Sequence, residues 1–314
     1  MAGRCVMSTL KVAVAEYVAL RRSLGFKFYG PEQRLKGFVR FMAQRKATVI
    51  TYPLALEWAT QPPGKRASWA LRFSDVRGLS QYLRSREPRT AVLPTRVLPF
   101  SKRTKPYLYS DVEIRQLLAA AFALRPAKAL RRWTYYCLFG LLIVTGLRIG
   151  EALALKRTDV DLQKGILTIE GTKFGKSRLV TLHSTTCAVL MRYAKRRDAH
   201  IDPPRSPYFF VAERGGRLLH QYVYTVFWRL SRQIGLRKPT DRTGPRIHDF
   251  RHRFAVGTLV HWYRSGQPVE QLLPVLSTYL GHVCVQDTYW YLSGCPEILG
   301  QAIKRLEHRW ETTS

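Results

Sequence analysis

The stretch of sequence that decides the fold is TGLRIGEAL, residues 145–153. Its first three residues end a run of 15 uncharged residues, 133–147, which stops at Arg148. At 1.5 Å of rise per residue this run is too short to cross a bilayer about 30 Å thick, so it predicts a buried core helix over residues 130–147. An arginine at the end of a helix is most often a charge that suits the helix dipole. Here Gly146 directly before Arg148 and Glu151 three residues after it favour a functional site instead.

The whole chain is strongly basic. Its 314 residues include 52 Lys and Arg against 21 Asp and Glu, a net charge of +31, while 46% hydrophobic residues suffice for real cores and exclude wholesale disorder. Residues 1–99 contain 18 basic and 5 acidic side chains, and the remainder contains 34 and 16, so no single basic tail explains the excess. We expect a polyanionic partner that both halves of the chain contact, as a clamp would.

The first hundred residues predict a helical bundle. Apolar residues recur at helical spacing in four segments, and a break over residues 25–31 separates the first two. After the fourth segment, Pro94, Pro99 and Pro106 lie among basic residues, which predicts an extended basic linker. We therefore expect a helical domain that clamps the polyanion, a linker and a larger second domain, over residues 1–87, 88–106 and 107–314.

The remainder of the chain predicts helices around one small sheet. Residues 166–170 and 178–182 alternate and are rich in β-branched side chains, with Gly171 and Gly175 between them, which predicts a hairpin. Ser110 is placed to cap the first helix. Helical periodicity predicts the other elements, over residues 111–124, 130–147, 184–197, 222–234, 248–264, 269–279 and 296–310. The expected fold is mainly α with a small β-sheet, an α+β domain that follows an N-terminal helical bundle.

Four short segments carry residues suited to phosphate chemistry. In chain order they are TGLRIGEAL (145–153), TKFGKSRLV (172–180), HDFRH (248–252) and LGH (280–282), whose histidine stands nine residues before Tyr291. Together they resemble the boxes of the tyrosine recombinase (phage integrase/Xer) family: T-G-x-R-x-x-E, a hairpin lysine, H-x-x-R, and G-H followed by Y. The resemblance runs from about Tyr107 to the end of the chain. The first hundred residues suit the family's core-binding domain by size and position.

The chemistry of this family explains why these residue types are needed. Breaking a phosphodiester without a metal requires a nucleophile, fixed positive charge on the phosphate oxygens and a proton for the leaving group. Arginine offers a bidentate fork for a phosphate. The resemblance implies that Arg148 and Arg251 bind the scissile phosphate, that Glu151 buttresses Arg148, and that Tyr291 is the nucleophile. The resulting 3′-phosphotyrosyl link keeps the bond energy, so rejoining needs no ATP.

The resemblance also assigns the proton-transfer and hydrogen-bonding groups. Lys173 of the hairpin matches the general acid, His248 matches the acid/base or phosphate-binding histidine, and His282 matches a second hydrogen-bond donor to the phosphate. Lys176 and Arg178 share the hairpin with Lys173, and any one of the three could instead be a solvated side chain or a DNA contact.

Two other tyrosines compete with Tyr291 for the role of nucleophile. Tyr279 stands on a helix whose apolar residues mark it as core, so its ring is expected to pack there. Tyr289 and Tyr291 are two residues apart, which on a helix separates their side chains by about 200°. If the segment is helical, only one of them points at the arginines, and the family spacing selects Tyr291.

Two rival motifs are weaker. His248 and His252 imitate the zinc-binding H-E-x-x-H helix, but Asp249 replaces the glutamate and Arg251 would repel a dication. The segment GKS (175–177) imitates the end of a phosphate-binding loop, but it lacks the required earlier glycine and lies in a hairpin. No metal, nucleotide or other cofactor site is expected.

The sequence therefore predicts a site-specific DNA recombinase or integrase that works without metal or ATP. The alternatives are a non-catalytic DNA-binding protein of the same fold and a topoisomerase-like DNA relaxer. The expected partners are double-stranded DNA and further copies of the chain in a synaptic tetramer, with companion recombinases or DNA-bending proteins as accessories. An apolar stripe on the helix over residues 296–310 would dock on a neighbouring subunit or on its own domain.

The setting of the protein is also expected from the sequence. Five scattered cysteines without a C-x-x-C pair, and an N-terminus without a leader pattern, predict a reducing, cytoplasmic location. We expect a nucleoid-associated protein that serves a mobile genetic element and does not contact a membrane.

Overall fold

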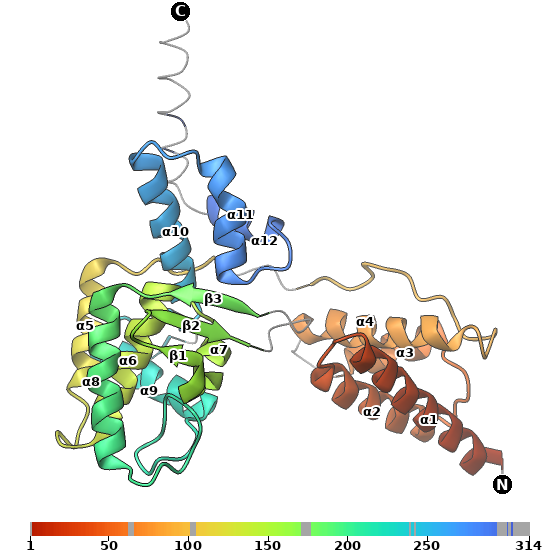
Figure 1. The fold of residues 1–314 in the computed structure, drawn as a ribbon. Helices are drawn as coiled ribbons and strands as arrows, with labels where there is room; N and C mark the ends of the chain where they lie inside the picture. Colours follow the sequence, from red (N-terminus) through yellow and green to blue (C-terminus); the bar gives the residue numbers. More distant parts are fainter. Residues whose placement is uncertain are drawn as a thin grey trace, which may run out of the picture. The chain divides into compact units, whose positions relative to one another are not determined.

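The computed structural model divides into two compact units (Figure 1). The first is Met1–Thr104, and the second is Lys105–Thr172 together with Lys176–Ser314. Lys173 and nearly all of the predicted helix over residues 296–310 lie outside the described residues. The structure describes residues 2–61, 66–100, 105–170, 177–238, 240–241, 243–293, 300 and 303, without the side chains of 2–9, 66–67 and 293.

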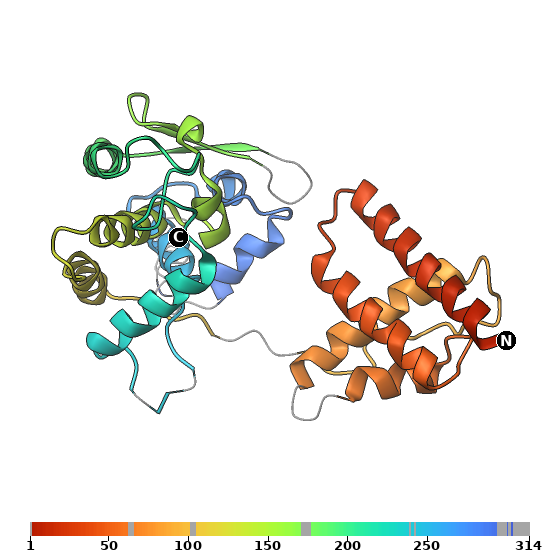
Figure 2. The same ribbon diagram turned by 90° about the horizontal axis from the view of Figure 1, so that it is seen from below.

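Four helices form the first unit and lie side by side in both views (Figures 1 and 2). Their apolar faces enclose a core in which Leu35 and Leu79 are fully buried. The predicted break over residues 25–31 is too long, because the second helix already begins at Tyr29. Proline is tolerated at Pro31 since the N–H groups of a first turn have no partner within the helix. The helices are α1 (Ala2–Ser23), α2 (Tyr29–Gln44), α3 (Tyr52–Thr60) and α4 (Arg66–Leu83).

Residues 84–100, the described part of the segment after α4, contain no helix or strand, yet they pack on the first unit. Leu93 is buried in the core of this unit, and Leu98 packs against it. The backbone N–H of Ala91 donates to the carbonyl of Ile50 at 2.9 Å. The basic segment that predicts a linker therefore begins as part of the first unit.

The second unit combines helices with a three-stranded antiparallel sheet, which confirms the predicted fold class. The strands β1 (Val160–Asp161), β2 (Ile166–Ile169) and β3 (Arg178–Thr181) pair in that order, and Leu167 lies opposite Val180 on the buried face. Within the described ranges, no helix of the chain is long and apolar enough to cross a membrane. The helices are α5 (Asp111–Phe122), α6 (Leu130–Thr145), α7 (Ile149–Ala154), the 3-10 helix η1 (Arg157–Asp159), α8 (Ser184–His200), α9 (His220–Gln233), α10 (Asp249–Arg264), α11 (Val269–Leu280) and α12 (Gln286–Ser293).

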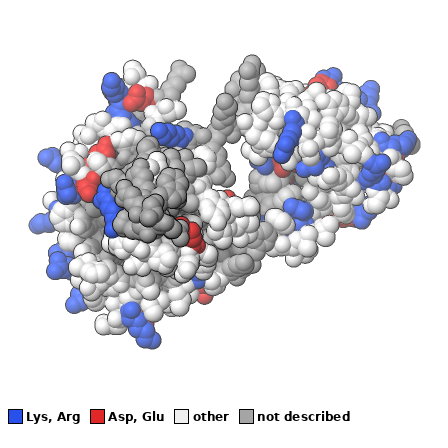
Figure 3. All heavy atoms as spheres, turned by 90° about the horizontal axis from the view of Figure 1, so that it is seen from above, with Lys and Arg blue, Asp and Glu red and all other residues white. Residues whose placement is uncertain are grey.

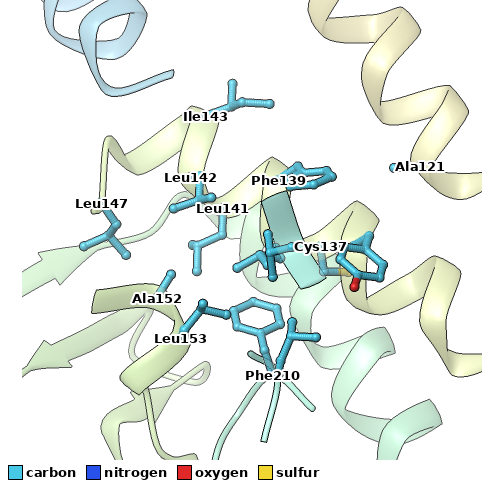
Figure 4. Packing of buried hydrophobic residues seen from close by; sticks show 14 of the residues in the cluster. Ala121, Cys137, Phe139, Leu141, Leu142, Ile143, Leu147, Ala152, Leu153 and Phe210 are labelled. Carbon is cyan, nitrogen blue, oxygen red and sulfur yellow. The ribbon is translucent and has the colours of Figure 1, made fainter. Parts of the chain in front are cut away.

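Helix α6 is the buried helix predicted from the uncharged run, and its side chains fill the core of the second unit (Figure 4). It ends at Gly146, whose φ of +63° is a left-handed conformation that favours glycine. A Cβ on Gly146 would also lie 2.7 Å from Cδ1 of Phe254, so space demands glycine as well. The short helix α7 follows at once and was not predicted, because six residues are too few for a periodic signal.

Helices α10, α11 and α12 contact one another and enclose a smaller core (Figure 1). Ala255, Leu259 and Val269 are fully buried there. Helix α11 ends at Gly281, with φ +70°, and the chain turns before α12. That turn and α12 were not predicted as elements, although they carry His282 and Tyr291.

Candidate active site

Arg148 stands at the junction of two helices. The left-handed turn at Gly146 ends α6, and Arg148 occupies the position directly before α7. Its Nη1 donates to Oε1 of Glu151 at 3.0 Å, and both Nη atoms donate to the carbonyl of Gly281 at 3.1 Å. The side chain is still 40% exposed. Arg148 is thus fixed on one side and accessible on the other, as an anion-binding group must be.

Arg251, from the first turn of α10, is almost completely buried. Only 2% of it is exposed, and its guanidinium donates to two backbone carbonyls, from Nη1 to Gly146 at 2.9 Å and from Nη2 to Leu280 at 2.7 Å. Burial lowers the pKa of Arg251, and the phenol of Tyr291 counteracts this effect. An arginine stays protonated under such conditions, so the site holds a positive charge whose partners are set before any substrate arrives.

The C-terminal end of α11 accepts hydrogen bonds from three arginines at three consecutive carbonyls. Arg178 Nε donates to Tyr279 at 2.7 Å, Arg251 to Leu280, and Arg148 to Gly281. The last carbonyls of a helix have no partners within it and carry the negative end of the helix dipole. The end of α11 therefore gathers positive charge from β3, α10 and the α6–α7 junction.

His282 follows this helix end and is tied to α12. Its Nδ1 lies 2.7 Å from Oγ1 of the buried Thr288. Burial, together with the charges of Arg251 and Arg148, lowers the pKa of His282 to about 4. The ring is therefore neutral at pH 7, and it stacks on Tyr291 with 5.8 Å between ring centroids.

Tyr291 is the tyrosine that the structure places among these groups. It is only 5% exposed, and its ring contacts those of both His282 and His252, with ring centroids 5.8 and 5.1 Å away. Tyr289 is half exposed. Tyr279 stacks on Phe254, and burial raises its pKa to about 12. The predicted nucleophile is thus the tyrosine beside the histidines and Arg251.

His248 lies at the start of α10 and is exposed. Its ring centroid is 5.3 Å from that of His252, which is itself in contact with Tyr291. Partial burial and the charge of Arg251 hold the pKa of His248 below its ordinary value. Five of the six predicted site residues therefore belong to one cluster, and Lys173 is the one that lies outside the described residues.

The structure adds two members that the sequence analysis did not assign to the site, Arg178 and His252. The sequence pattern indicates only a hairpin charge for Arg178 and a candidate zinc ligand for His252. The Nδ1 of His252 is buried without a hydrogen-bond partner, and burial lowers its pKa to about 4. The signal for Arg178 was its place at the base of the hairpin, but nothing in the sequence shows that its side chain turns inward.

The zinc alternative has little support from this geometry. Asp249 is fully buried and bound to Arg246, with 2.7 Å between Oδ1 and Nη2. Across the described ranges, no group of three His, Cys, Asp or Glu residues is arranged to hold a metal ion. A cavity of about 340 Å³ lined by parts of α6 and α9 contains none of the site residues.

Comparison with known proteins accounts for this cluster. Residues 108–294 match the Phage integrase family. The chain is 52% identical over 312 residues to the integrase/recombinase y4rB of Sinorhizobium fredii, covering 97% of this chain and 99% of that protein. It is 30% identical to the tyrosine recombinase XerD of Caulobacter vibrioides, over 76% and 74% of the two chains.

Solved structures share the fold at lower identity. The Tn1549 transposon integrase in complex with circular intermediate DNA superposes with a TM-score of 0.66 at 17% identity, covering 94% of this chain and 99% of that one. A lambda integrase dimer bound to a COC′ core site gives 0.61 at 19% identity, covering 90% and 76%. With its boxes and its sequence relatives taken together, the chain belongs to the phage integrase family of tyrosine recombinases.

Proposed function

We propose that this protein is a site-specific DNA recombinase that cleaves and rejoins strands through a 3′-phosphotyrosyl intermediate on Tyr291. The observation that carries the proposal is the position of Tyr291, which contacts the rings of His252 and His282 and lies beside the buried charge of Arg251. Its relatives named integrase/recombinase and tyrosine recombinase support the same reaction.

The two arginines supply the electrostatic part of the reaction. Charge builds on the non-bridging phosphate oxygens as the transition state forms, and fixed donors stabilise it without reorganising. Arg148 is held by Glu151 and Gly281 but remains accessible. The guanidinium of Arg251 is fixed by its hydrogen bonds to two backbone carbonyls. We assign the scissile phosphate to these two guanidinium groups.

The bond changes balance without metal or ATP. The phenol oxygen of Tyr291 forms a bond to phosphorus while the bond to the 5′ oxygen breaks. The leaving oxygen takes a proton from Lys173, assigned to this role by resemblance. The phenol proton passes to His248, which its lowered pKa keeps neutral and able to accept. A 5′-hydroxyl of another strand then reverses the steps and releases Tyr291.

We further propose duplex DNA as the partner. Lys and Arg side chains stand out over Asp and Glu on the face of each unit seen in Figure 3, which suits a polyanion. The structural neighbours named above are themselves complexes with DNA. In this proposal residues 1–87 are the core-binding domain, residues 107–314 are the catalytic domain, and four copies form the synaptic complex. We also propose that the protein is cytoplasmic and serves a mobile genetic element.

Covalent capture tests the function directly. The full chain is incubated in EDTA with a library of nicked duplexes that carry randomised half-sites, and SDS-resistant protein–DNA adducts are sequenced. We expect adducts on a subset of sequences, and joining to a second duplex that offers a 5′-hydroxyl. DNA binding without any adduct would favour the non-catalytic alternative. Relaxation without joining would favour the topoisomerase alternative, and loss in EDTA with rescue by zinc would revive the metal reading of His248 and His252.

A further inference from the structure

We propose that Arg178 is a positioning residue of this active site: from β3 it fixes Glu151 and the end of α11, and through them the two arginines that face the phosphate. The inference rests on the proposed function and concerns a residue that does not itself touch the substrate.

The first support is a buried two-bond ion pair. Nη1 and Nη2 of Arg178 donate to the two oxygens of Glu151 at 3.1 and 2.8 Å, and the two side chains are only 8% and 12% exposed. The same carboxylate accepts from the side chain and backbone N–H of Arg148. Burial opposes ionisation of Glu151, yet the bonds and charge of Arg178, followed by those of Arg148, keep its pKa below the ordinary value.

The second support is the contact of Arg178 with the end of α11. Its Nε donates to the carbonyl of Tyr279, one residue before the carbonyl that binds Arg251 and two before the one that binds Arg148. A Cβ built on Gly281 would lie 2.6 Å from Nη1 of Arg178, so the guanidinium packs directly against the turn. Displacing Arg178 therefore displaces the acceptors of both arginines and the turn that carries His282.

These contacts give each guanidinium nitrogen of Arg178 a partner, and the side chain is only 8% exposed, which separates it from an ordinary hairpin charge. All of its nitrogens have a partner within the second unit. A surface charge would gain little from pairing and would stay hydrated. A buried guanidinium with a partner at each nitrogen instead links β3, α7 and α11 in one arrangement.

The chain offers a matched control in Arg197. This arginine is also buried, and it also binds a carbonyl, that of Phe209 at 2.8 Å, and a carboxylate, that of Asp198 at 2.8 Å. Neither partner belongs to the site. Arg197→Met therefore reports the cost of losing any buried arginine, and Arg178→Met reports that cost plus the loss of positioning.

The test compares cleavage of a captured nicked duplex by Arg178→Lys, Arg178→Met and Arg197→Met. Lysine retains the charge but cannot reproduce the fork and the Nε bond together. We expect Arg178→Lys to bind DNA within about twofold of wild type and to form the adduct about 10²-fold more slowly, the scale for a misplacement of about 1 Å. Per folded molecule, Arg197→Met should cleave at nearly the wild-type rate. Equal rates for Arg178→Lys and wild type would overturn the inference.

A second readout separates positioning from general damage. Replacing the scissile phosphate by a methylphosphonate removes a charge that Arg148 and Arg251 bind, so the penalty of Arg178→Lys should shrink on this substrate. An unchanged penalty would mean that Arg178 does not act through the arginines. If the wild type forms no adduct at all, the proposed function fails instead. The crystal structure of Arg178→Met then still decides the inference, because unmoved Arg148 and Gly281 would overturn it.

Discussion

Three arginines of the first unit and two of the second lie in contrasting environments. In the first unit, Arg22, Arg45 and Arg86 each pair with a glutamate on the surface and remain about half exposed. In the second unit, Arg178 and Arg251 are buried and donate to carbonyls at the end of α11. Exposed pairs contribute little and are screened by salt, whereas a buried guanidinium persists only where its donors find acceptors. The abundant surface charge thus suits attraction to a polyanion, and a few fixed arginines suit the chemistry.

The largest effect expected from this comparison is on cleavage. Arg251→Lys keeps the charge but loses the fork that reaches Gly146 and Leu280 together, so adduct formation should slow by a factor of about 10² or more. The rate is measured on a captured nicked duplex, with DNA affinity measured in parallel. The matched surface variant Arg86→Lys should cleave like wild type. A rate for Arg251→Lys within about threefold of wild type would contradict the distinction between exposed surface arginines and buried arginines of the site.

A smaller effect is expected on stability in acid. His252 and His282 have pKa values of about 4 in the folded protein, against an ordinary value of 6.5. As the pH falls below about 6.5, the histidines of the unfolded chain take up protons before those of the folded chain do, so the free energy of unfolding should decrease until about pH 4. Below about pH 4 these two histidines should cause little further change. With solvent screening we expect a loss on the order of 1 to 3 kcal/mol.

Urea unfolding at pH 7 and pH 4.5 measures this loss. The variant His252→Phe replaces a ring whose Nδ1 has no partner, so it should show a shallower loss than wild type and similar or greater stability at pH 7. An identical pH dependence in the two proteins would mean that His252 is not held neutral by the fold.

The smallest effect is expected at the surface of the first unit. Removing the exposed pair by Arg86→Ala should leave the free energy of unfolding nearly unchanged, because water and salt screen such a pair. If Arg86 contacts a phosphate, the slope of log affinity against log salt should fall by about 0.9 in magnitude. Thermal unfolding and a salt series of DNA binding provide the two values. A loss of several kcal/mol would show that surface pairs hold this unit together.

Most helices could be predicted from sequence because their apolar residues repeat over several turns. The uncharged run gave α6 and the alternating segments gave β2 and β3, within a few residues at each end. Elements α7 and β1 are too short to show a periodic pattern. Helix α12 is also short, and the choice between Tyr289 and Tyr291 is conditional on its being helical. The class of fold followed because the long helices and the hairpin dominate it.

The site was predicted from spacing and resemblance, and its roles remain to be tested. Arg148, Arg251, His282 and Tyr291 come from segments that are distant in sequence, and their contacts depend on how α6, α10, α11 and α12 pack. Arg178 and His252 could not be found in this way. Whether a hairpin arginine faces water or a carboxylate 27 residues away is decided by tertiary packing, which no local pattern encodes.

The central claim is that Tyr291 is the nucleophile, and mapping the covalent adduct tests it most directly. The trapped complex is digested with nuclease and protease, and mass spectrometry locates the phosphorylated peptide and residue. We predict phosphate on Tyr291, an adduct with Tyr289→Phe, and none with Tyr291→Phe although that variant binds DNA nearly as well as wild type. Phosphate on Tyr289, or an adduct formed by Tyr291→Phe, would contradict the account.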